Sequence, residues 1–88
     1  MTEMNYLKIE HLVKNRFKKY VFTRADKSLL LCQVWQFKVY VDMNSMIVYV
    51  QLPYTEMNRN YYKNKARAYK LKEKVNRYLR RIIKNKYL

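Results

Sequence analysis

Seven basic residues in the last third of this 88-residue chain are spaced as one face of an α-helix would require. The intervals between them alternate between four and three residues. The seven are Lys63, Arg67, Lys70, Lys74, Arg77, Arg81 and Lys84. Such a row can bind a regular array of anions, because each cation can neutralise a phosphate and release its counterion. Lysine is the majority cation of the chain, which favours contacts with a nucleic-acid backbone over the reading of bases.

The positive charge is concentrated in this segment. The chain carries a net charge of +14, of which residues 58–88 contribute +11, from twelve Lys or Arg and one acid, Glu73. A solvated helix face usually interleaves acids, because like charges at i,i+4 repel. The uncompensated row therefore indicates a polyanionic ligand, with a purely solvated face or an acidic protein partner as the alternatives.

Tyrosine gives a second signal, with ten residues in the chain. We expect Tyr40 and Tyr49 on the outer face of a sheet, beside Lys38. Aromatic rings among cations suit the stacking of unpaired bases, although tyrosine is also a good strand former. His11 and Lys18, on the polar face of a predicted N-terminal helix, are further candidates for nucleic-acid contacts.

Residues for catalysis and for cofactor binding are scarce. The chain has one histidine, one cysteine and no glycine, which excludes glycine-rich phosphate loops, cysteine zinc sites and an internal disulfide. The six acids are scattered, without the spacing of a two-carboxylate site. We therefore expect no enzymatic activity, no cofactor and no metal.

The longest apolar run covers residues 46–50, far short of the ~20 residues of a membrane span. Residues 1–10 lack the apolar core of a signal peptide. We expect a cytoplasmic protein without a membrane partner.

Hydrophobic spacing predicts an α+β fold in the order α-β-β-β-α. A helix over residues 3–20, with Thr2 as its N-cap, would bury Tyr6, Ile9, Val13, Phe17 and Tyr20. A sheet of two to three antiparallel strands would follow. A helix over residues 56–87, capped by Thr55 or Asn58, would pack on that sheet through a stripe at seven-residue spacing: Tyr61, Ala68, Val75 and Ile82.

The clearest predicted sheet element is a hairpin with its turn at residues 43–44. This turn would place Val41 opposite Met46 and Trp35 opposite Leu52 on one apolar face. Asn44 would supply the positive φ, because no glycine is available. Residues 29–42 are long for one straight strand, so a bend or bulge is expected near Cys32, and residues 20–24 could add another strand.

The predicted order of elements is similar to the αβββα layout of double-stranded-RNA-binding domains. Lys63, Lys65 and Arg67, around Ala66 and Ala68, resemble the start of that family's second helix, where lysines contact phosphate. The glycines of that family are absent from this chain. The second helix of the family is also shorter than the helix predicted here over residues 56–87. The resemblance is therefore one of layout, which by itself does not carry function.

Together these features predict a single domain over residues 1–88, with residues 80–88 as a segment that can project or fray. We expect it to bind nucleic acid mainly through phosphate contacts, with RNA favoured over DNA, as a monomer or a homodimer. The alternative is a small phage or mobile-element regulator of the anti-CRISPR kind, which binds a host nucleoprotein complex.

Overall fold

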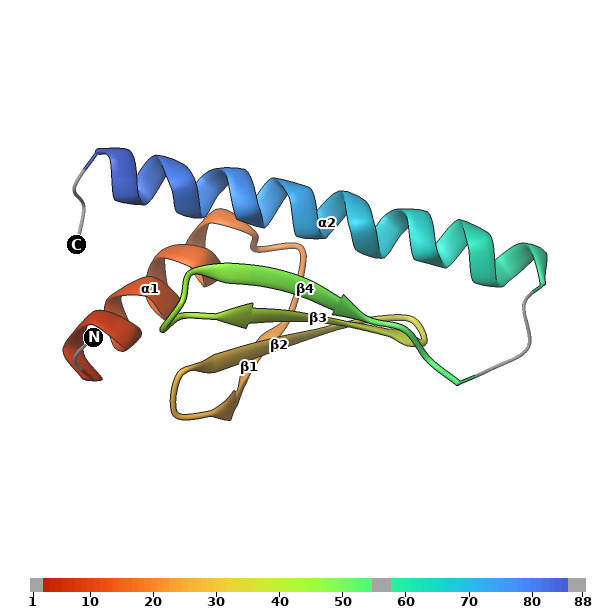
Figure 1. Ribbon diagram of the computed structural model, residues 1–88, viewed down its shortest axis with the longest axis horizontal. Coiled ribbons are helices and arrows are strands. Elements are labelled where there is room, and N and C mark those ends of the chain that lie inside the picture. Colours follow the sequence, from red (N-terminus) through yellow and green to blue (C-terminus); the bar gives the residue numbers. More distant parts are fainter. Residues whose placement is uncertain (1–2, 55–57, 86–88) are drawn as a thin grey trace.

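The computed structural model describes residues 3–54 and 58–85. Two helices flank four strands in the chain: α1 (Glu3–Arg16), β1 (Phe22–Asp26), β2 (Leu29–Val34), β3 (Phe37–Asp42), β4 (Ile47–Gln51) and α2 (Arg59–Lys84) (Figure 1). The predicted α+β architecture is confirmed, with the long C-terminal helix packed on an antiparallel sheet. The predicted strand count was wrong, because the sheet has four strands, and this also departs from the αβββα layout. Asn58 caps α2, whereas the alternative cap Thr55 and the proposed cap Thr2 lie outside the described residues.

The extra strand arises because residues 29–42 form a hairpin instead of one bent strand. The strands follow one another in the order β1-β2-β3-β4, and Val34 pairs with Phe37 across a two-residue turn. Buried positions fall on even residue numbers in β2 and on odd numbers in β3. The switch from even to odd buried positions occurs at the turn over residues 35–36. Trp35 lies in this turn and is exposed, instead of pairing with Leu52 as predicted.

The predicted β3–β4 hairpin forms, but its register differs by two residues. Val41 pairs with Val48, because the loop covers residues 43–46. The Asp42 carboxylate accepts hydrogen bonds from the backbone N–H groups of Asn44 and Ser45, at 2.9 and 3.2 Å. These two hydrogen bonds stabilise the conformation of the four-residue loop. The positive φ falls on Met46, at 60°, and not on Asn44 as predicted.

One face of the sheet is covered by both helices. The core combines the inward side chains of the strands with Tyr6, Ile9 and Val13 of α1. The side of α2 that faces the sheet contributes its buried residues: Tyr61, Asn64, Ala68, Leu71, Val75, Leu79 and Ile82. Tyr20 was predicted on this side but is exposed, because α1 ends at Arg16 and the chain turns away. No helix in the described ranges is long and apolar enough to span a bilayer.

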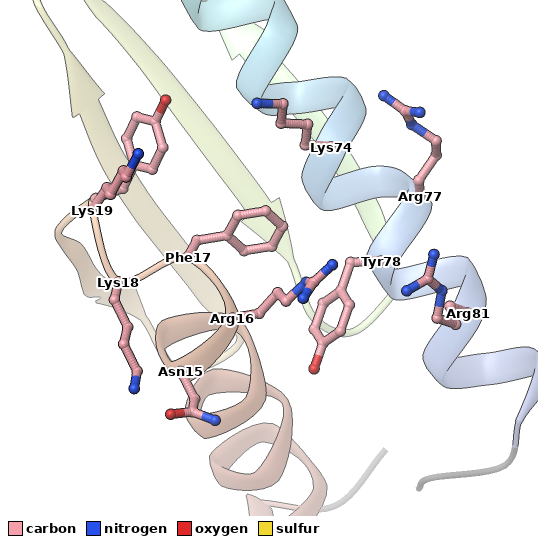
Figure 2. Close-up of a pocket in the computed structure, with 10 residues that line it drawn as sticks. Asn15, Arg16, Phe17, Lys18, Lys19, Lys74, Arg77, Tyr78 and Arg81 are labelled. Atoms are coloured by element: carbon pink, nitrogen blue, oxygen red, sulfur yellow. The ribbon is translucent and has the colours of Figure 1, made fainter.

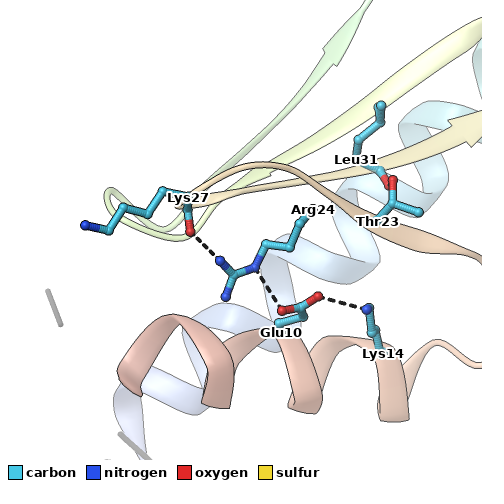
Figure 3. Close-up of polar contacts among 6 residues, drawn as sticks. All are labelled: Glu10, Lys14, Thr23, Arg24, Lys27 and Leu31. Atoms are coloured by element: carbon cyan, nitrogen blue, oxygen red, sulfur yellow. Dashed lines mark hydrogen bonds and ion pairs between the residues drawn. The ribbon is translucent and has the colours of Figure 1, made fainter. Parts of the chain in front are cut away.

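An ionic contact fixes α1 against β1 (Figure 3). Glu10 accepts a hydrogen bond from Arg24 Nε at 2.8 Å and pairs with Lys14 Nζ at 2.8 Å. Burial acts to raise the pKa of the Glu10 carboxyl, but the hydrogen bonds and charges of Lys14 and Arg24 outweigh it and hold the pKa below its ordinary value of 4.5. The ionised carboxylate is therefore part of the contact between α1 and the sheet.

Replacing Glu10 with Gln should lower the free energy of unfolding at neutral pH by about 1–3 kcal/mol, since Arg24 loses a charged partner. Because the folded pKa is depressed, this stabilisation is present above the unfolded carboxyl pKa and is lost as pH falls through the folded value. Urea unfolding at neutral pH and at about pH 3 would measure both effects. The two proteins should then differ at neutral pH and converge in acid.

Lys14→Gln is the control, since its side chain is 47 % exposed and i,i+4 surface pairs contribute about 0.3–0.5 kcal/mol. An equal cost for both variants, or a gap between wild type and Glu10→Gln that persists in acid, would contradict the assigned role of Glu10.

Candidate functional site

A cleft of about 770 Å³ lies between the C-terminal end of α1 and the C-terminal half of α2 (Figure 2). One wall comes from the last turn of α1 and the connection that follows it, and the other from α2. The lining residues are Asn15, Arg16, Phe17, Lys18, Lys19, Tyr20, Lys74, Arg77, Tyr78 and Arg81. The two walls meet here because both helices pack on the same face of the sheet.

The cleft is strongly electropositive. Six of its ten lining residues are Lys or Arg, and none is acidic. Among the described residues, no ion pair involves any of these six cations. The two helix C-termini at this end each contribute only about −0.5 of a charge, which six unit charges outweigh. The site therefore favours an anion with several negative charges.

Aromatic rings join the two walls. Phe17 and Tyr78 meet edge to face, with ring centroids 5.8 Å apart, and Figure 2 shows them between the basic side chains. The Arg16 guanidinium lies 5.8 Å from the centroid of Tyr78. Tyr20, which is 37 % exposed, also lines the cleft. These rings give the cleft flat apolar surfaces among its cations, a combination suited to unpaired bases.

All seven cations of the predicted row are exposed on α2, as the spacing required. Lys74, Arg77 and Arg81 line the cleft. The others continue the row along the helix: Lys63, Arg67 and Lys70 before the cleft, and Lys84 in the last turn. We define the cationic row as these seven residues.

The other predicted site residues divide between two surfaces. Lys18 lines the cleft, whereas His11 is exposed on α1 outside it. Lys38, Tyr40 and Tyr49 project from the face of the sheet that the helices leave open. The rings of Tyr40 and Tyr49 are stacked there with centroids 5.2 Å apart. The outer-face prediction therefore agrees with the fold, but these residues do not join the cationic row.

Sequence reasoning missed Arg16 and Lys19 as members of the site. Their signal was the group of basic residues on either side of Phe17, near the end of the predicted helix, of which only Lys18 was singled out. The approach of α1 to α2 is a tertiary contact, so helix periodicity could not reveal that this run faces the row.

Two kinds of reactive group bear on catalysis in the described part of the chain: a metal-binding cluster and an activated cysteine. The described residues contain no cluster of three His, Cys, Asp or Glu side chains that could hold a metal ion. Burial raises the pKa of the Cys32 thiol above its ordinary value, against a smaller lowering effect of a backbone hydrogen bond with Val21. Since the thiolate is the reactive form, Cys32 is suited to packing and not to nucleophilic attack.

The crowded cations of the row predict that the free protein is less stable at low salt. Replacing Lys74 and Arg81 with Gln removes four like-charge pairs at i,i+3 or i,i+4, two with Arg77 and one each with Lys70 and Lys84, at a few tenths of a kcal/mol per pair. The free energy of unfolding should therefore rise by about 1 kcal/mol in total, which raises Tm by about 4–8 °C at low ionic strength. The gain should shrink on raising salt from about 0.02 to 0.5 M, because screening weakens the repulsion in the wild type.

Thermal melts at both salt concentrations would measure this effect. Lys8→Gln is the matched control, because Lys8 is exposed on α1 and has no other Lys or Arg three or four residues away. A wild-type Tm that does not change with salt would show that the row is not under repulsion.

The candidate site is thus an open, basic cleft with aromatic side chains, extended along α2 by the rest of the cationic row. Compared with protein-family models, curated proteins and solved structures, the chain matches none of them.

Proposed function

We propose that this chain is a nucleic-acid-binding protein without catalytic activity, which holds the phosphate backbone in the basic cleft and along the cationic row. RNA is the favoured ligand over DNA. The proposal rests on the meeting of six cations from the two walls of the cleft, with no carboxylate among its described lining residues.

The charge of the cleft supports a polymeric anion. A single small anion would need only two or three of the six cations, and the rest would remain in mutual repulsion. The row extends the surface from Lys63 to Arg81, ~27 Å along the helix axis. A phosphate backbone offers charges over that whole length, and the counterions it releases contribute to the binding free energy.

The residue types support RNA with unpaired segments. Three of the six cleft cations are arginines, which can stack on bases as well as pair with phosphates. Tyr20 and Tyr78 place aromatic rings beside them. Sequence-specific recognition of RNA uses mainly single strands and loops, whose bases can stack on aromatic and guanidinium groups.

The outer sheet face is the weaker candidate for the main interface. Of the predicted contact residues on this face, Lys38 is the one that is basic. The acidic residue Asp42 lies on the same strand and offsets its charge. Tyr40 and Tyr49 remain a predicted second contact, which a ligand could reach only by passing around an edge of the sheet.

The triple variant Lys74→Gln, Arg77→Gln, Arg81→Gln should weaken RNA binding about 100-fold at ~0.1 M salt, if each residue neutralises one phosphate of a single strand. The measurement is fluorescence anisotropy of a labelled single-stranded RNA of ~12 nucleotides, which at 3.4 Å per nucleotide spans the row. Circular dichroism would confirm that the variant is folded.

The matched control removes the same charge from α2 outside the row, as Lys65→Gln, Lys72→Gln, Arg80→Gln; Lys65 and Lys72 are half-buried and Arg80 is exposed. The affinity of this control should fall less than ~10-fold, because only long-range attraction is lost. Equal losses in the two triple variants would place the interface elsewhere. A protein partner that stays bound to the wild type after nuclease treatment of a lysate, without nucleic-acid binding in vitro, would favour the regulator alternative.

A further inference from the structure

Trp35 occupies an unusual place for a large apolar side chain. It lies in the two-residue turn between β2 and β3, its φ is 57°, and it is 65 % exposed. Two-residue hairpin turns favour glycine, asparagine or aspartate where φ is positive, and a bulky residue there is strained. Burial does not compensate for the strain, since most of the indole is in solvent. A residue in this state at the surface points to a functional contact.

The turn that carries Trp35 is firmly attached to the fold. Gln33 Nε2 donates a hydrogen bond to the Trp35 carbonyl at 2.6 Å. The next residue, Gln36, accepts a hydrogen bond from Asn64 Nδ2 at 3.0 Å, and Asn64 is a buried residue of α2. The indole is therefore presented from a fixed backbone and costs little entropy to use in binding.

The indole also adjoins the cationic row. The guanidinium of Arg67 lies 5.9 Å from the ring centroid, in cation–π geometry. Arg67 Nη1 in turn donates a 3.4 Å hydrogen bond to Asn64 Oδ1. Lys63 and Lys70, four residues before and three after Arg67, are exposed on the same face of α2. An aromatic surface and three exposed cations thus lie together, about 21 Å along α2 from Arg81 in the cleft.

We propose that Trp35 is a stacking site for one unpaired base of a bound nucleic acid, whose adjoining phosphates lie on Lys63, Arg67 and Lys70. This inference rests on the proposed function and assigns the stacking of one unpaired base to a single residue. The bases inside a duplex are already stacked on one another and offer no free face to the indole, whereas a single strand does.

Trp35 is the only tryptophan, so its fluorescence reports on this position alone. The protein would be titrated with a single-stranded RNA of ~12 nucleotides, the DNA of the same sequence, a duplex RNA and inorganic polyphosphate, which has charge but no bases. Both single strands should quench the emission and protect it from acrylamide. Polyphosphate should displace labelled RNA and leave the emission close to that of the free protein.

Two variants test the energetic contribution. Trp35→Asn suits the positive φ and removes the ring, so it should fold at least as stably and bind single-stranded RNA about 5- to 150-fold more weakly. Trp35→Phe keeps a stacking surface and should lose less affinity. The affinity for duplex RNA should stay within about twofold in both variants, since the phosphate contacts are unchanged.

The outcomes separate this inference from the proposed function. Unchanged affinity of Trp35→Asn for single-stranded RNA, with the wild type still binding in a salt-dependent way, overturns the stacking site and leaves the proposed function intact. Absence of binding to every nucleic acid at ~50 mM salt overturns both.

Discussion

The packing of α2 on the sheet is the interaction on which the rest of the structure depends. Residues on one side of the helix, such as Ala68, Val75 and Ile82, are fully buried against the strands and α1. Their burial stabilises the helix against the repulsion among the seven cations on its exposed side. Each repulsive pair costs a few tenths of a kcal/mol, whereas each buried Val, Leu or Ile side chain contributes about 1.5–3 kcal/mol. The fold can therefore hold a row of charges that an isolated helix of this sequence would not.

The position of α1 then converts the row into a cleft. The Glu10–Arg24 contact holds α1 to β1, and the edge-to-face contact of Phe17 with Tyr78 joins the end of α1 to α2. Basic residues of the α1–β1 connection are brought opposite those of α2 in this way. The carboxylates with described hydrogen bonds serve other parts of the fold: Glu10 holds α1, Asp26 accepts a hydrogen bond from the Lys27 backbone N–H, and Asp42 organises the β3–β4 loop. Among the described residues, the six cations of the cleft consequently remain without an ion pair.

Much of this arrangement could be predicted from the sequence, because it depends on local periodicity. The buried and basic sides of α2 follow from spacings of three and four residues, and the two faces of the β3–β4 hairpin follow from alternation. The β2–β3 turn was missed because Trp35 and Gln36 carry none of the usual turn chemistry, and only the change of phase between strands marks it. The cleft was missed for a different reason: the contact between α1 and α2 is made by residues about 60 positions apart, which no local pattern encodes.

The salt dependence of RNA binding tests the central claim most directly. If the six cations of the cleft each neutralise one phosphate of a single strand, a plot of log K against log salt concentration should be linear with a slope of about −4, and more negative if the rest of the row is engaged. Anisotropy titrations of the wild-type protein between about 50 and 300 mM salt would give this slope. Undetectable binding at the lowest salt, or a slope close to zero, would contradict the account.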